Sequence, residues 1–82
     1  MSGASPPLAF AAFRDHLAAE LDVDLTDSQP GDRLGEDLEL DSLQRLEALV
    51  AVEELGAYLP DDSAGPGQTL GGLHDLYRRT RG

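Results

Sequence analysis

The segment from Ser42 to Leu55 has the spacing of a helix with two apolar faces, which limits how the chain can fold. At about 100° per residue, one face can attach the helix to a core through Ala48, Leu49, Val52 and Leu55. The opposite face mixes apolar side chains with carboxylates: Leu43, Leu46, Glu47, Val50, Glu53 and Glu54. A core has no use for carboxylates, so we interpret this face as an exposed apolar patch with an acidic rim, as in docking sites. The alternative is a helix that is buried on two sides.

The residues at the start of this helix suggest a modification site. Asp41 and Gln44 have the spacing of a capping box, which makes Ser42 the first helical residue. The Ser42 hydroxyl would then lie on a helix end that faces solvent, beside unpaired backbone N–H groups and the positive end of the helix dipole. A phosphate attached to Ser42 would be well accommodated there. Taken alone, Asp-Ser before an apolar run indicates only a helix start.

Two further helices are predicted, one on each side of this helix in the sequence. Apolar residues at helical spacing predict a first helix at about 7–21: Phe10, Phe13, Leu17 and Leu21. It follows Ser5, an N-cap candidate, and two prolines that suit a first turn. Thr69 is an N-cap candidate for a last helix at about 69–79, whose apolar side is formed by Leu70, Leu73 and Leu76 or Tyr77. The predicted fold class is all-α, a small bundle with three main helices.

A long acidic loop is expected at about 22–41, between the first two helices. Apolar and acidic residues alternate from Leu21 to Leu25, but this short run has no partner strand, so we favour a helix end that leads into the loop. Leu34 and Leu38, with Leu25, are expected to attach the loop to the core. Loops of this length in compact domains are usually functional. The acidic residues lack the Gly and Glu of an EF-hand, so no calcium site is predicted.

The segment that follows the second helix has few residues that could anchor it. Gly56 is expected to end the helix in a left-handed conformation, and Tyr58 and Leu59 are expected to return to the core. Residues 61–68 contain two glycines, one proline and no aliphatic side chain larger than alanine. We therefore predict a mobile segment there and not a stable short third helix.

Composition and charge limit the possible partners. The chain has 82 residues with sixteen acidic and six basic side chains, for a formal net charge of −10. We expect one small domain at 7–80 after a flexible segment at 1–6. The acidity disfavours nucleic acid and favours partners with basic patches. There is no cysteine, no signal peptide and no apolar run of about 20 residues, so we expect no disulfide, no metal site, no membrane segment and a cytoplasmic monomer.

The acidic loop, the helix start and the segment after Gly56 together resemble the acyl carrier protein family. The resemblance is carried by LGEDLELDSL at 34–43, Glu47, EELG at 53–56 and LPD at 59–61, and it covers about residues 10–77. It implies that Ser42, after Asp41, carries 4′-phosphopantetheine from coenzyme A, and that acyl groups ride on its thiol as thioesters. It also implies that the second helix binds partner enzymes, through Leu43, Leu46, Glu47, Val50, Glu53 and Glu54. The sequence departs from the family at 61–68 and at Glu39, where Gly is common.

The resemblance implies a phosphopantetheinyl transferase that uses Mg²⁺ and an acyltransferase, ketosynthase or adenylating enzyme with a basic docking patch as partners. Asp41 before Ser42 favours acyl cargo, and Glu39 favours polyketide or other specialised biosynthesis over housekeeping fatty acid synthesis. With a Met start and no neighbouring domain, a stand-alone carrier is expected.

Two other interpretations remain open, and a third is disfavoured. Stand-alone carriers of amino acids, peptides or D-alanine also use Asp-Ser and are the alternative carrier assignment. An acidic helical adaptor without a prosthetic group is a more remote possibility. An enzyme with Ser42 as nucleophile would need a positioned base, but His16 and His74 lie in no motif, so no catalysis is expected.

Overall fold

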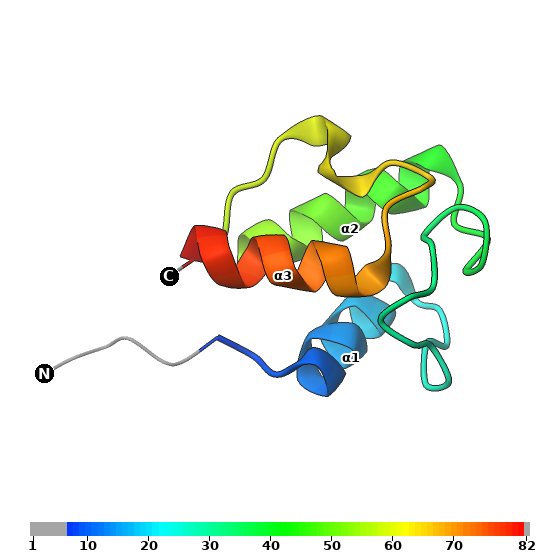
Figure 1. Ribbon diagram of the computed structural model, residues 1–82, viewed down its shortest axis with the longest axis horizontal. Helices are drawn as coiled ribbons and strands as arrows, with labels where there is room; N and C mark the ends of the chain where they lie inside the picture. Colours follow the sequence, from blue (N-terminus) through cyan, green and yellow to red (C-terminus); the bar gives the residue numbers. More distant parts are fainter. Residues whose placement is uncertain (1–6, 82) are drawn as a thin grey trace, which may run out of the picture.

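The computed structural model describes residues 7–81 and shows a small all-α protein (Figure 1). Its elements are α1 (Phe10–Leu21), α2 (Ser42–Glu54), the short 3₁₀ helix η1 (Asp61–Ala64) and α3 (Leu70–Arg81). Within the described residues there is no β-strand, only an isolated bridge between Arg33 and Thr69. The predicted fold class with three main helices is therefore confirmed. The predicted flexible segment at 1–6 lies outside the described residues.

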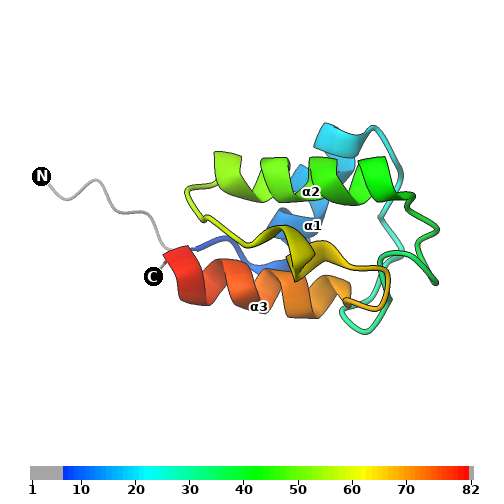
Figure 2. The same cartoon turned by 90° about the horizontal axis from the view of Figure 1, so that it is seen from above.

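The three α-helices enclose one apolar core. α2 and α3 run in the same direction along the long axis of the molecule, and α1 packs against both (Figures 1 and 2). The short helix η1 packs against α2. The largest fully buried side chains come from all three α-helices and from the loop after α1: Tyr77, Phe13, Leu17, Leu34, Leu70, Leu73 and Val52.

The first helix starts at Phe10, three residues later than the sequence predicts. Ala9, just before the helix, is extended, and Leu8 bonds to α3. The N–H of Leu8 donates to the Tyr77 hydroxyl at 2.8 Å, and its carbonyl accepts from His74 Nε2 at 2.8 Å. At the other end, α1 stops at Leu21 and Asp22 takes a left-handed conformation, so the expected helix end leads into the loop as predicted.

The loop between α1 and α2 is tied to the segment that precedes α3. Leu34 N–H donates to the Gln68 carbonyl at 2.8 Å, and Gly35 N–H donates to the Pro66 carbonyl at 3.0 Å. This approach requires glycine, because a Cβ on Gly35 would lie 2.6 Å from Pro66 Cβ. Leu25 is buried as well, so the prediction that leucines attach the loop to the core is confirmed.

The predicted N-cap of the last helix is confirmed. Thr69 Oγ1 accepts from the N–H of Gly72 at 2.9 Å, and α3 extends to Arg81, two residues beyond the predicted end. This bond satisfies one of the donors that the first turn leaves unpaired.

Two expectations about residues 56–68 differ from the structure. A 3₁₀ turn forms at η1, where the sequence predicts no stable helix, and its anchors are the small buried side chains of Ser63 and Ala64. The Gln68 side chain also holds the turn, because Nε2 donates to the Ser63 carbonyl at 3.0 Å. The prediction that Tyr58 returns to the core is wrong, since this residue is 76% exposed. The prediction for Leu59 is confirmed, because Leu59 is buried, as is Ala57 on the other side of Tyr58.

Candidate functional site

Ser42 occupies the first helical position of α2, at a capped and exposed helix end. Asp41 Oδ1 accepts from Gln44 N–H at 2.8 Å, and Gln44 Oε1 accepts from Asp41 N–H at 3.1 Å, which confirms the predicted capping box. Among the hydrogen bonds of the described residues, none uses the Ser42 hydroxyl or the N–H of Ser42 or Leu43. The Ser42 hydroxyl is therefore available for modification, and the N–H groups of Ser42 and Leu43, at the positive end of α2, can bind an anionic substituent.

The chain that enters α2 is fixed in direction by three contacts. Leu40 is buried and its N–H donates to the Leu34 carbonyl at 3.0 Å. The Leu40 carbonyl in turn accepts from Arg45 Nη1 at 2.9 Å. Just before Leu40, Glu39 turns the chain through a left-handed conformation with φ 58°. These contacts position Asp41 and Ser42 relative to the core without covering the Ser42 side chain.

The outer face of α2 exposes the side chains that the sequence places there. Its apolar members are large and solvent-exposed: Leu43 (63%), Leu46 (51%) and Val50 (55%). Its acidic members, also exposed, are Glu47, Glu53 and Glu54. We call these six residues the docking face. The opposite side of α2 is buried through Ala48, Leu49, Ala51 and Val52, so the helix is not buried on two sides.

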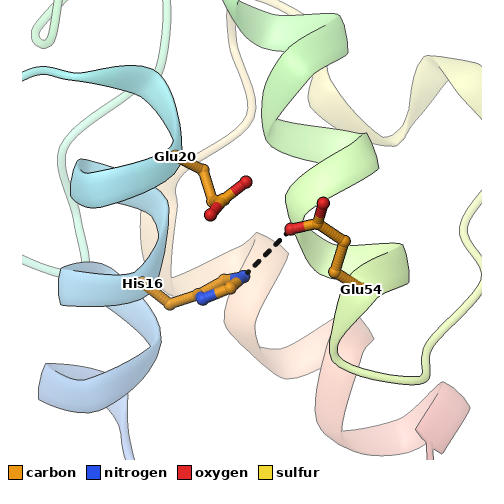
Figure 3. Close-up of side chains that lie close together, drawn as sticks. All are labelled: His16, Glu20 and Glu54. Atoms are coloured by element: carbon orange, nitrogen blue, oxygen red, sulfur yellow. Dashed lines mark ion pairs between the residues drawn. The ribbon is translucent and has the colours of Figure 1, made fainter.

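Glu54 differs from the other acidic residues of the docking face because its carboxylate faces α1 (Figure 3). Its Oε1 lies 3.8 Å from His16 Nε2. A hydrogen bond with Glu20, partial desolvation and repulsion by the Glu20 carboxylate raise the pKa of Glu54, while the nearby His16 lowers it. This group could not be predicted from the sequence because its members lie on two helices. The only local signal was the four-residue spacing of His16 and Glu20, which places them on one side of a helix.

Both histidines bond to backbone carbonyls, so each carries its proton on Nε2. His16 Nε2 donates to the Ala51 carbonyl at 3.0 Å, and His74 Nε2 donates to Leu8 as described above. The His74 ring also packs against Phe13, with ring centroids 5.0 Å apart. A cavity of about 420 Å³ lies beside His74 and is lined by Pro7, Leu8, Ala9, Phe10, His74 and Arg78. No residue of α2 lines this cavity, so it is not a chamber next to Ser42.

No protein-family model matches the chain, and no curated protein matches its sequence. Among residues 7–81, no helix is long and apolar enough to cross a membrane. Fold and site define a small all-α protein with an exposed serine at a capped helix start, followed by an exposed face of apolar and acidic side chains.

Proposed function

We propose that this chain is an acyl carrier protein, with 4′-phosphopantetheine attached to Ser42. The observation that supports this most directly is the exposed Ser42 hydroxyl, which makes no hydrogen bond within the described residues and adjoins the docking face. The proposal also holds that the chain carries cargo without catalysis of its own. Acyl cargo, specialised biosynthesis and a cytoplasmic location are parts of the same proposal.

The residues around Ser42 suit this attachment. The Ser42 oxygen would form the new bond to phosphorus, its proton would pass to a base of the transferase, and adenosine 3′,5′-bisphosphate would leave from coenzyme A. The N–H groups of Ser42 and Leu43 and the helix dipole favour the resulting negative charge. The prosthetic group supplies a thiol on which acyl groups are carried as thioesters. The capping box keeps the helix start formed while the group is handled by different enzymes.

The docking face supports the proposed partners. Three large apolar side chains more than half exposed beside carboxylates form a surface that an enzyme with a basic rim could cover. With a formal net charge of −10, the protein would also attract such an enzyme at a distance. The proposed partners are a phosphopantetheinyl transferase and an acyltransferase, ketosynthase or adenylating enzyme.

The segment between α2 and α3 favours a short or polar cargo. Its buried anchors, Ser63 and Ala64, are small, and the cavity beside His74 has no wall from α2. A long acyl chain would therefore find little preformed apolar space next to Ser42. Thermal unfolding of the protein loaded with acyl chains of increasing length tests this expectation. A midpoint that climbs steadily with chain length would contradict it.

Modification of Ser42 can be tested directly. The purified chain is incubated with coenzyme A, Mg²⁺ and a promiscuous phosphopantetheinyl transferase, and its intact mass is measured. One added group is expected on the wild type and none on Ser42→Ala. Ser28 and Ser63 are buried, so they act as internal controls when the modified peptide is identified. A wild-type chain that stays unmodified with several transferases would favour the adaptor alternative.

The cargo class needs a second measurement on the modified protein. Acyltransferases with acyl-coenzyme A donors and adenylating enzymes with amino acids are compared for loading of the thiol. Loading by the acyltransferases is expected. Selective loading by an amino acid-activating enzyme would instead assign the chain to the aminoacyl or D-alanyl carriers.

A further inference from the structure

Three side chains that can each supply one metal ligand meet where α1 packs on α2 (Figure 3). His16 and Glu20 lie one turn apart on α1, and Glu54 is the last residue of α2. Their candidate ligand atoms all lie within 4.8 Å of one another. We propose that His16, Glu20 and Glu54 form a binding site for a divalent transition-metal ion of the Zn²⁺ type, which links the two helices. We call these residues the interhelical trio.

The charges of the trio favour a cation. The candidate ligand atoms of Glu20 and Glu54 lie within 4.8 Å of each other, and this contact raises the pKa of Glu54. Two neighbouring carboxylates repel each other unless a proton or a cation lies between them. Among the side chains that the structure describes, the arginine ion pairs join other acids, and none joins an arginine to Glu20 or Glu54. The basic partner of Glu54 in this set is His16, at 3.8 Å, which is itself a member of the trio.

The distance between His16 and Glu54 is close to that of a tetrahedral site, and the Glu20 oxygen lies within 4.8 Å of both. Zinc bonds of about 2.0–2.2 Å place ligand atoms about 3.4 Å apart. His16 Nε2 and Glu54 Oε1 are 3.8 Å apart, so they need to approach by only a few tenths of an ångström. The Glu54 side chain is 50% exposed and that of His16 is 25% exposed, which leaves a path for the ion and freedom for the carboxylate to rotate.

His16 must change its hydrogen bond when the ion binds. Its Nε2–H donates to the Ala51 carbonyl, and this nitrogen can coordinate a metal only without the proton. Coordination by Nε2 would therefore require the ring to turn away from the Ala51 carbonyl, which breaks this bond, and to carry its proton on Nδ1. The loss of that bond lowers the affinity below that of a site with a free imidazole.

The donor set selects the class of metal. One imidazole nitrogen with two carboxylate oxygens suits Zn²⁺ and its transition-metal neighbours, because imidazole is a good ligand for them. Mg²⁺ and Ca²⁺ prefer six or more oxygen ligands, which the trio does not offer. Three protein ligands leave one tetrahedral position for water, as in zinc sites that are not purely structural.

Metal binding by the trio does not depend on modification of Ser42, and the experiment keeps the two questions apart. Untagged full-length Ser42→Ala protein is used, so that no prosthetic thiol can bind the ion. Zn²⁺ binding is measured by calorimetry, and Co²⁺ binding by its visible absorption. We expect one ion per chain and a midpoint of thermal unfolding that rises by on the order of 10 °C at one hundred times the Kd, because the ion binds the folded form.

Two variants of equal charge test the location of the ion. Glu20→Gln should weaken Zn²⁺ binding at least tenfold, because it removes a ligand oxygen of the trio. Glu53→Gln removes the neighbouring exposed carboxylate of α2 outside the trio and should change the Kd by less than twofold. Equal losses in both variants would overturn the proposed site, because they would indicate general attraction to an acidic protein. Displacement of Zn²⁺ by an equal concentration of Mg²⁺ would overturn the proposed metal class.

Discussion

Glu39 is held in a left-handed conformation that glycine adopts more easily, so Glu39→Gly should stabilise the protein. Its φ is 58° and its side chain is exposed, two residues before the N-cap of α2. The conformation costs an ordinary L-residue about 1–2 kcal/mol. Glycine avoids this cost but loses about 0.5–1 kcal/mol more backbone entropy on folding. The difference predicts a gain of roughly 0.5–1 kcal/mol in the free energy of unfolding.

Thermal unfolding followed by circular dichroism is the assay for Glu39→Gly. In a domain of this size, 1 kcal/mol shifts the midpoint by about 4–8 °C. The predicted gain therefore corresponds to an increase of about 2–8 °C. Glu39→Ala is the matched control, because it removes the same carboxylate but keeps Cβ, and it should not raise the midpoint.

Asp22→Gly provides a second comparison. Asp22 has a similar φ of 56°, but aspartate tolerates the left-handed region better than glutamate, so its gain should be smaller. If Glu39→Ala raised the midpoint as much as Glu39→Gly, relief of charge repulsion would explain the gain, and the reasoning from backbone strain would be wrong.

The remaining predictions concern the helix cap, the core and the loop. Asp41→Ala should lower the free energy of unfolding by about 1 kcal/mol in urea titrations, whereas Asp41→Asn should be nearly neutral; equal losses would mean that the cap is not the cause. Leu34→Ala removes a fully buried side chain and should cost about 2–5 kcal/mol in the same assay, and a smaller loss would show that the loop is loosely packed. Backbone and side-chain hydrogen bonds from Arg33 lower the pKa of Asp37. The stability that this carboxylate contributes is therefore present above the usual aspartate pKa and is lost as the pH falls through the lowered value. Asp37→Asn should be less stable than wild type at pH 7, and the difference should shrink as the pH falls below the usual aspartate pKa of about 3.9; a difference that does not shrink in acid would exclude this linkage.

The features that could be predicted from the sequence are those that local spacing determines. Buried residues of α2 recur at helical spacing, so Leu49 and Val52 could be assigned to the core and Leu43 to the surface before any contact was known. The capping box depends only on Asp41 and Gln44, which are three residues apart. The position of Ser42 at an exposed helix start follows from these two patterns.

The features that could not be predicted depend on contacts between distant residues. α1 begins late because Leu8 bonds to Tyr77 and His74, which lie 69 and 66 residues further along the chain. The turn at η1 forms without a large anchor because it packs directly on α2, so small side chains are enough to bury it. The composition of residues 61–68 indicates only that they have little apolar area to bury, and this alone does not require the segment to be mobile.

Glu54 shows how a correct helical pattern can still leave the role of a side chain incomplete. Its spacing along α2 places it with the exposed acids, and it is exposed, but α1 brings His16 and Glu20 to it. Reversal of its charge would therefore disturb the packing of two helices as well as the docking face. Glu47, further from this contact, is the better probe of docking: Glu47→Lys should slow transfer of phosphopantetheine to Ser42 at low salt, because charges at the rim of an interface act mainly on the association rate. Asp27→Lys, which makes the same change at an exposed position in the loop, should leave that rate nearly unchanged. Equal rates for wild type and Glu47→Lys would exclude an electrostatic role for the docking face.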